Sequence, residues 1–244
     1  LVPGTVYREH TCVVAMNGKD WRVTDPNTLF VERTQQFLPN PVLTIPDVRL
    51  EGALRAEVTL DYWSGHPGTT GKKIRFNEGK RWIPLEEHLE GAPLPAMDYY
   101  AQYNLTLDVP LDHLVEGDNT IRGTCSDNAW GWGQWGWYSI TLRVYLDPAR
   151  LGDFNAVVKA VTDPTPSGHP AFQLEASDPE RVGRVDYLAR YHGLDENGEG
   201  HLHDYHGFYR SGEWHGHVGT AGSATENIVW DTSWVPDQEL PVSV

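Results

Sequence analysis

The stretch AEVTLDYW, residues 56–63, decides the fold class because its apolar side chains recur at every second position. Period-two alternation is typical of a β-strand with one buried face. The same alternation recurs at 105–109 and 140–146, and 24 Gly and 17 Pro separate short segments rich in Val, Thr, Tyr and Trp. The sequence therefore predicts an all-β protein. The buried face of the first stretch would carry Ala56, Val58, Leu60 and Tyr62.

Turn signals divide these strands into two predicted domains, residues 1–148 and 149–244. Asp147-Pro148 closes the first series, and residues 149–153 form a short linker. Strand spacing and turn chemistry in the second domain suit an immunoglobulin-like β-sandwich. Its strands are expected at 154–161, 172–177, 184–191, 201–209, 214–219 and 227–234.

The second domain is expected to lack its last strand, because Val244 falls within what would be the penultimate one. An immunoglobulin-like sheet without that strand would expose an edge, and exposed edges are rarely left bare. Either the natural polypeptide continues, or a neighbouring molecule donates a strand. The second alternative predicts self-association.

The phrase VPLDHLVEGDNTI, residues 109–121, resembles the penultimate-strand signature of galactose-binding-like β-sandwiches. These occur as sugar-binding domains of many glycosidases and as free carbohydrate-binding modules. The resemblance covers roughly half of the chain and implies that residues 1–148 form a jelly-roll β-sandwich. Residues 176–180 with 185–187 are similar to bacterial immunoglobulin-like domains appended to secreted carbohydrate-active proteins. Because fold alone does not give activity, both resemblances support architecture more than chemistry.

Composition limits the partners of the chain. A formal net charge of −15 opposes binding to nucleic acid or to an anionic membrane surface. No apolar run reaches the roughly 18 residues of a membrane span. Ten Trp and eleven Tyr against two Met and two Cys are typical of exported β-sandwiches. We therefore expect a secreted, extracellular protein with a neutral or cationic ligand.

A tryptophan cluster in residues 125–138 is the strongest candidate ligand site. Indole rings stack on pyranose rings, and the intervening glycines leave indole faces open. The alternative is that Trp135 and Trp137 begin the last strand and pack in the core. The predicted sugar contacts are Trp130, Trp132 and Trp135, with hydrogen bonds from Asp127, Asn128 and Gln134.

The loop SGHPGTTG, residues 64–71, is too long for a tight hairpin and is a second candidate for ligand contact. His66 would pair with a sugar hydroxyl or a metal, beside Trp63. The alternative is that Pro67 and the glycines only shape the loop. Other side chains that would share a face with Trp63 are Asp61, Arg75, Asn77 and Trp82.

Two segments of the second domain contain residues of the types that bind metal ions. The first is a predicted hairpin that turns at residues 211–212. Alternation along its strands would place one carboxylate and three imidazoles on the same face, where they could bind zinc or copper. These residues are Asp204, His206, His215 and His217. Oxygen ligands at Asp195, Asn197 and Glu199 resemble the opening of a calcium loop, although the EF-hand pattern is incomplete. The alternatives are an ordinary polar surface and a plain acidic turn.

The two cysteines allow a disulfide. Cys12 and Cys125 fall in the first and last strand regions of the first domain, and those strands often lie side by side in a jelly roll. Two buried free thiols are the alternative, since two cysteines carry no framework signal.

No catalytic residue is assigned, because the sequence contains none of the common nucleophile, zinc-protease or phosphate-loop motifs. This absence does not exclude an enzyme, but the family resemblance and the tryptophan cluster favour a non-catalytic extracellular protein, or accessory module, that binds a polysaccharide. One alternative is a structural subunit of an extracellular polymer, assembled by strand addition or metal bridging. A jelly-roll polysaccharide hydrolase or lyase is the other.

Overall fold

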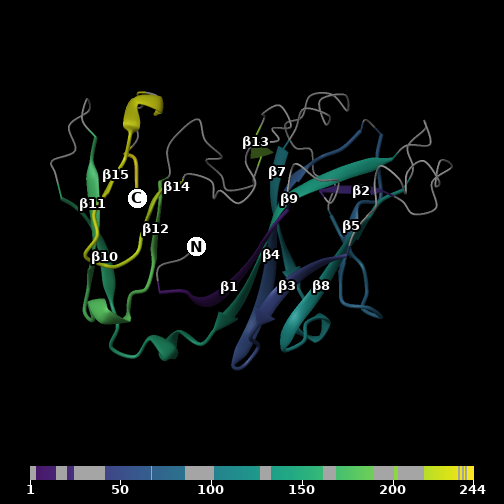
Figure 1. Ribbon diagram of the computed structural model, residues 1–244, viewed down its shortest axis with the longest axis horizontal. Helices are drawn as coiled ribbons and strands as arrows, with labels where there is room; N and C mark the ends of the chain where they lie inside the picture. The colour runs from purple at the N-terminus through teal and green to yellow at the C-terminus, as the bar shows by residue number, and fades with distance from the viewer. Residues whose placement is uncertain are drawn as a thin grey trace. The chain divides into compact units, whose positions relative to one another are not determined.

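A computed structural model describes residues 4–14, 21–24, 42–66, 68–85, 102–126, 133–161, 169–189, 201–202, 217–235, 237, 239 and 241–244. Within these ranges the regular elements are β-strands and 3-10 turns of three or four residues (Figure 1). The all-β prediction is confirmed. In the same ranges, no helix has the length and hydrophobicity needed to cross a bilayer. The chain groups into two compact units, residues 1–148 with 199–212 and residues 149–198 with 213–244.

The first unit contains two antiparallel sheets. Sheet A has the order β1-β9-β4-β7-β13, and β2 also pairs with β9. Sheet B has the order β3-β8-β5-β6. The strands of sheet A are β1 (Val6–Val13), β2 (Arg22–Thr24), β4 (Ala53–Trp63), β7 (Gln102–Val109), β9 (Gln134–Leu146) and β13 (His201–Leu202). Those of sheet B are β3 (Leu43–Val48), β5 (Lys73–Phe76), β6 (Ile83–Pro84) and β8 (Gly117–Thr124).

The connectivity of the first unit is that of a jelly roll. When the short strands β2 and β13 are set aside, eight strands remain among the described residues of this unit. In chain order these run one-eight-three-six in sheet A and two-seven-four-five in sheet B, which is the double Greek-key order of a jelly roll.

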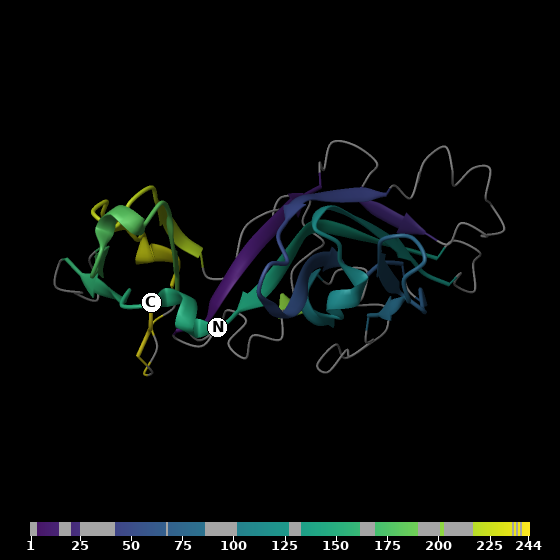
Figure 2. The ribbon, with the colours of Figure 1, turned by 90° about the horizontal axis from the view of Figure 1, so that it is seen from below.

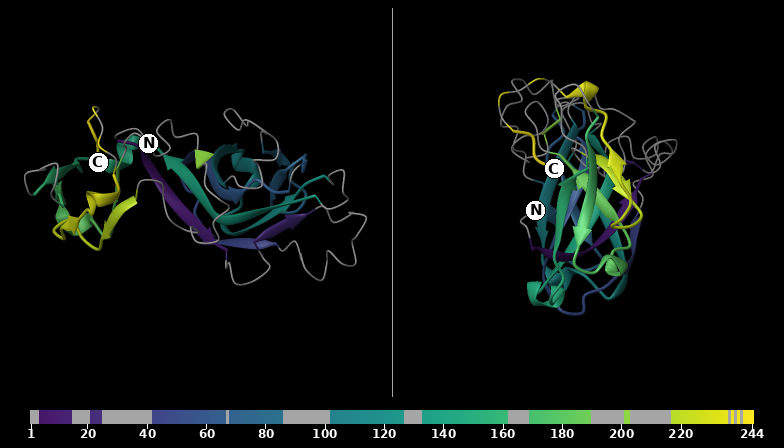
Figure 3. Two further views of the ribbon diagram at one scale, coloured as in Figure 1. Left: turned by 90° about the horizontal axis from the view of Figure 1, so that it is seen from above. Right: turned by 90° about the vertical axis from the view of Figure 1, so that its left-hand side faces the viewer.

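The two sheets of the first unit face each other (Figures 2 and 3). Among the described residues, one hydrophobic core of this unit lies between them. The predicted inward positions of β4 are all buried, at 6% exposure or less. They pack with inward residues of β9, such as Leu142, and with Ile74 and Ile121 of sheet B, all fully buried. Alternation along each strand therefore leaves the second set of side chains on the outer face of its sheet.

Asn119, from the phrase at residues 109–121, organises the turn before β8. The side chain is fully buried. Its Nδ2 donates to the carbonyl oxygens of Val115 (2.7 Å) and Gly117 (2.9 Å). Its Oδ1 accepts from the backbone N–H of Val115 (2.9 Å) and from Nδ2 of Asn77 (2.8 Å). Gly117 and Asn77 both have positive φ, so the phrase holds two tight turns together.

The second unit contains a three-stranded sheet and a two-stranded sheet, both antiparallel. The first has the order β10-β11-β15 and the second pairs β12 with β14. A small core joins buried Tyr187, Ala221 and Ile228. The strands are β10 (Ala156–Ala160), β11 (Ala171–Ala176), β12 (Val185–Leu188), β14 (His217–Ala221) and β15 (Ile228–Val229).

Two expected strands of the second domain differ from the structure. The strand expected at 227–234 stops at Val229, and Thr232–Trp234 is a 3-10 turn because Asp231 caps it by accepting from the N–H of Ser233 (3.0 Å). Of the strand expected at 201–209, the described part is β13, and it pairs with β7 of the first unit. The immunoglobulin-like assignment and the domain boundary stay predictions.

Candidate functional site

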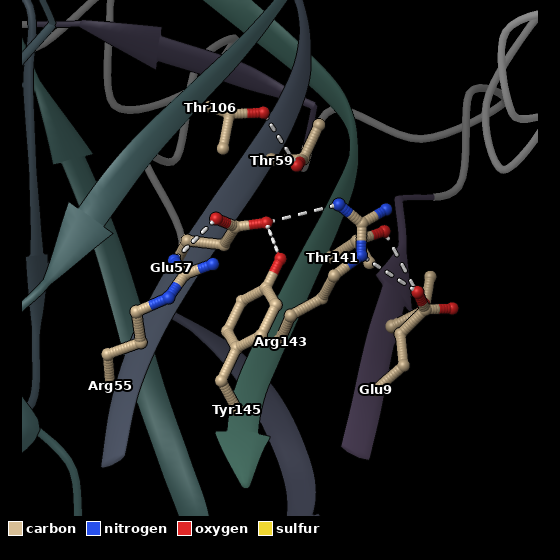
Figure 4. A network of polar contacts seen from close by, with 9 residues as sticks. Glu9, Arg55, Glu57, Thr59, Thr106, Thr141, Arg143 and Tyr145 are labelled. Atoms are coloured by element: carbon tan, nitrogen blue, oxygen red, sulfur yellow. Dashed lines mark hydrogen bonds and ion pairs between the residues drawn. The ribbon is translucent and has the colours of Figure 1, made fainter. Parts of the chain in front are cut away.

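The outer face of sheet A carries polar side chains in rows that cross the strands, and we call it the polar face (Figure 4). Strand register sets these rows. Glu9 of β1 lies opposite Arg143 of β9, which lies opposite Glu57 of β4. The next row consists of Thr11, Thr141, Thr59 and Thr106, from β1, β9, β4 and β7.

The charged row is tied together by hydrogen bonds to Glu57 and Glu9. Arg143 donates from Nε to Glu9 (3.1 Å) and from Nη1 to Glu57 (3.4 Å). Arg55 donates to the other oxygen of Glu57 (3.0 Å), and the Tyr145 hydroxyl also donates to Glu57. The Arg55 guanidinium lies 3.5 Å from the centroid of the Tyr145 ring. These contacts hold the charged donors and acceptors of the row in fixed positions.

The threonine row provides hydroxyl groups that both donate and accept hydrogen bonds. The hydroxyl oxygens of Thr59 and Thr106 are 2.9 Å apart, and those of Thr11 and Thr141 are 3.4 Å apart. Thr11 and Thr106 are exposed, whereas Thr141 is covered by its neighbours. The accessible hydroxyls of the row therefore lie over β1, β7 and the adjoining part of β4.

Hydrogen bonding fixes the protonation state of the two groups at the centre of the charged row. Burial would raise the pKa of Glu57, but the hydrogen bonds from Tyr145, Arg55 and Arg143 outweigh burial and lower it. Burial, together with the Glu57 carboxylate, raises the pKa of Tyr145 to about 12. Glu57 is thus a fixed acceptor and Tyr145 a fixed donor at neutral pH. Neither group is poised for proton transfer, which needs a pKa near the working pH.

Aromatic side chains close one end of the polar face. The Trp63 ring lies edge-on to His66, with centroids 5.5 Å apart, and 5.8 Å from Trp21. Trp21 stacks on Tyr138 at 6.0 Å. Asp61 lies two residues before Trp63 on the same face and is 3% exposed. Burial, and then the Asp61 charge, raise the pKa of the Tyr138 hydroxyl.

The loop at 64–71 is joined to the start of β9, so His66 and Gln134 lie at this same end. The backbone N–H of His66 donates to the carbonyl oxygen of Gln134 (3.0 Å), and Thr69 Oγ1 accepts from the Gln134 N–H (3.2 Å). Gly65 has a φ of 110°, and a Cβ there would lie 2.3 Å from the Gln134 carbonyl oxygen. The Gln134 side-chain Oε1 is buried without a hydrogen-bond partner among the described residues. The structure thus brings together Trp63, His66 and Gln134.

The prediction that Trp135 contacts a sugar is wrong. Its ring is fully buried, and its Nε1 donates to the carbonyl oxygen of Thr124 (3.1 Å). Trp137 is also fully buried, with its ring centroid 5.3 Å from that of Trp135. The core alternative is confirmed for both rings, because β9 begins at Gln134 rather than near residue 140. Trp63 itself is only 3% exposed, so its ring offers little open surface.

Several predicted site residues lie outside the described part of the chain. Among the predicted sugar contacts these are Asp127, Asn128, Trp130 and Trp132. Among the predicted metal ligands they are Asp195, Asn197, Glu199, Asp204, His206 and His215. His217 belongs to β14, where its backbone pairs with Leu188. No group of three or more His, Cys, Asp or Glu within the described ranges is arranged to hold a metal ion. Zinc, copper and calcium remain sequence predictions.

The predicted disulfide between Cys12 and Cys125 is wrong, since both are free thiols. Cys12 lies in β1 of sheet A, opposite Ile140 of β9. Cys125 follows β8 in sheet B, where its Sγ lies 3.5 Å from the carbonyl oxygen of Gly133. The first and last strands of the jelly roll, β1 and β9, are indeed neighbours, but Cys125 comes directly after β8, which belongs to the opposite sheet.

The side chains that would share one face with Trp63 are divided between the two sheets. Asp61 belongs to the polar face with Trp63. Arg75 and Trp82 instead contact one another beside β5 of sheet B, with the guanidinium 4.8 Å from the indole centroid. The sequence interpretation also missed Glu9 and Glu57. The alternation of polar residues in both strands was visible, but the register that aligns them with Arg143 was not.

Comparison with known proteins adds no assignment to this geometry. No protein-family model matches the chain, and a search of the curated proteins finds no match. The galactose-binding-like resemblance therefore stays a prediction, and the function of the polar face has to be inferred from its own side chains.

Proposed function

We propose that the chain is a secreted, non-catalytic carbohydrate-binding protein that holds a polysaccharide on the polar face. One observation carries the proposal: rows of hydroxyl and charged side chains cross three or four strands in register. Neighbouring strands lie about 4.8 Å apart, a distance similar to the size of one pyranose ring. Successive sugars of an extended chain running across the strands would each meet a donor and an acceptor.

The chemistry of the polar face favours binding over turnover. A sugar hydroxyl needs partners that both donate and accept, and the threonine hydroxyls meet this need. Catalysis of glycoside hydrolysis needs one carboxylic acid whose pKa is raised so that it can donate a proton. Glu57 has the opposite shift. Because three donors keep the Glu57 carboxylate ionised, it can act as a hydrogen-bond acceptor but not as the proton donor.

Trp130 and Trp132 complete the proposal as stacking residues. In the sequence they come shortly before Gln134, the first residue of β9, whose carbonyl oxygen accepts from the backbone N–H of His66 beside Trp63. Aromatic rings beside hydrogen-bonding rows are the usual composition of a sugar site.

Affinity gel electrophoresis in neutral polysaccharides tests this function. The double variant Thr59→Ala/Thr106→Ala removes paired hydroxyls of the polar face and is expected to weaken retention about thirtyfold, since each of the two lost hydrogen bonds is worth about 1 kcal/mol. Trp130→Ala/Trp132→Ala should weaken it by at least as much. Thr44→Ala, an exposed threonine of sheet B, is the matched control and should behave as wild type. Unchanged retention of both double variants in every polysaccharide would refute the proposal.

A structural subunit is the second candidate function, and one observation favours it. Strand β10 is an edge strand of the three-stranded sheet, and all five of its residues are exposed. Val157 and Val158 are 58% and 36% exposed. An apolar edge with unpaired backbone groups is a template for strand addition.

A further inference from the structure

Cationic side chains gather around β5, although the chain as a whole is acidic. The sequence KKIRFNEGKRW, residues 72–82, contains five of the 19 Lys and Arg of the chain and a single acidic residue, Glu78. The formal net charge of the whole chain is −15. This segment is therefore positively charged within a chain whose net charge is negative.

The fold places several of these cations on the outer face of sheet B. Ile74 and Phe76 are fully buried, so alternation directs Lys73 and Arg75 outward. Arg75 pairs in register with Arg122 of β8, which adds a second guanidinium directly opposite the first. We call the outward surface formed by Lys73, Arg75, Trp82 and Arg122 the basic face.

Trp82 holds the cations of the basic face in position. The Arg75 guanidinium lies 4.8 Å from the indole centroid, and the Lys73 ammonium lies 5.5 Å from it. Cation–π contacts of this kind attract the charge to the ring. They also reduce the freedom that long side chains would lose when a ligand binds. Arg75 is consequently well packed, with 18% of its side chain exposed, whereas Arg122 remains 41% exposed.

Two arginines directly opposite each other repel, which destabilises a sheet unless an anion lies between them. In the structure that anion is Glu78. One of its oxygens is 2.8 Å from Arg75 and the other is 3.6 Å from Arg122. The Glu78 side chain is 74% exposed, and an exposed ion pair contributes little stability. A carboxylate therefore fits between the guanidinium groups and is held there weakly enough to be replaced.

We infer that the basic face is a second binding site, which takes the carboxylate or sulfate groups of an acidic polysaccharide. An incoming anionic group displaces Glu78 and accepts charge-assisted hydrogen bonds from Arg75 and Arg122, while Lys73 neutralises the neighbouring charge. Single-stranded DNA is a polyanion without carboxylate or sulfate groups, so it serves as the competing ligand in the test. This site does not depend on the polar face, since the two lie on different sheets.

The test measures retention in polygalacturonate, dextran sulfate and neutral dextran gels, with single-stranded DNA in a parallel shift assay. Wild type should be retained by one or both acidic polysaccharides, and less so as salt increases. Arg75→Gln/Arg122→Gln should lose at least about tenfold in affinity, since hydrogen bonds to charged groups are the strong ones. Lys159→Gln/Arg184→Gln removes the same charge from exposed residues of the second unit and should bind as wild type.

A gain of affinity separates this site from a simple loss of folding. Glu78→Gln removes the displaceable anion and should tighten binding to the same polysaccharide several-fold, whereas Glu175→Gln, an exposed carboxylate of β11, should not. Equal affinity of the wild type, Arg75→Gln/Arg122→Gln and Glu78→Gln would overturn the proposal. Preferential binding to DNA would overturn the assignment to a polysaccharide. Neither result bears on neutral-sugar binding by the polar face.

Discussion

Glu57 shows how one side chain couples the polar face to the stability of the fold. Its pKa is lowered from 4.5 because three hydrogen bonds to the ionised form outweigh the effect of burial. The unfolded chain therefore binds this proton more tightly than the folded chain does. The stabilisation is complete above the unfolded pKa, and it is lost as the pH falls through the lower folded value.

Replacing Glu57 with Gln should lower the free energy of unfolding at neutral pH by about 1–3 kcal/mol, because Arg143 and Tyr145 lose a charged acceptor. The difference from wild type should shrink as the pH falls below the unfolded pKa and through the lowered folded pKa, where wild type also loses the charge. Urea denaturation followed by fluorescence at several pH values measures both effects. Asp108→Asn, an exposed carboxylate opposite Glu57 in β7, is the control. A difference that stayed constant on acidification would contradict the lowered pKa.

At the scale of the element, the turn into β8 depends on Asn119. Its amide satisfies one N–H and two carbonyl groups of the turn and also contacts Asn77. Replacing it with Ala leaves these groups unpaired in a buried site. We expect a loss of about 3 kcal/mol in the free energy of unfolding. Thermal and urea denaturation measure it, with Asp112→Ala, exposed in the same connection, as the control. A loss as small as the control's would show that the turn forms without the amide.

The strands were predictable where apolar and polar residues alternate regularly. The errors in assigning buried residues occur where this alternation is missing. Ala56 to Tyr62 gave the correct buried face because polar residues separate the apolar ones. Residues 134–139 consist of aromatic, small and amide side chains without a polar alternation, and β9 shifts register opposite Asp61 and Tyr62. Trp135 therefore looked like a surface residue although it is buried.

Register accounts for what the sequence could not reveal about the sites. Arg143, Glu57 and Glu9 are far apart in the chain, and only pairing across three strands puts them in one row. Arg75 and Arg122 meet for the same reason. The disulfide prediction failed because Cys125 was assigned to the wrong strand, which placed it in the wrong sheet.

At the scale of the whole molecule, the second candidate function predicts that the edge strand β10 pairs with another copy of the chain. If its exposed backbone pairs with a second copy, association should grow with concentration in size-exclusion chromatography with light scattering. Val157→Lys should then shift the population to monomer, because a charge on an edge strand opposes pairing. Val115→Lys changes another exposed valine, in a connection of the first unit, and should leave association unchanged. A wild-type chain that is monomeric at every concentration would exclude β10 as an assembly surface.

The sandwich also has a geometric consequence. Its shared core turns the polar face and the basic face in opposite directions, so a polymer held by one leaves the other open. A single jelly roll with both faces occupied would cross-link two kinds of polysaccharide chain. In a mixture of neutral and acidic polysaccharides, it would thicken the network rather than merely coat either component.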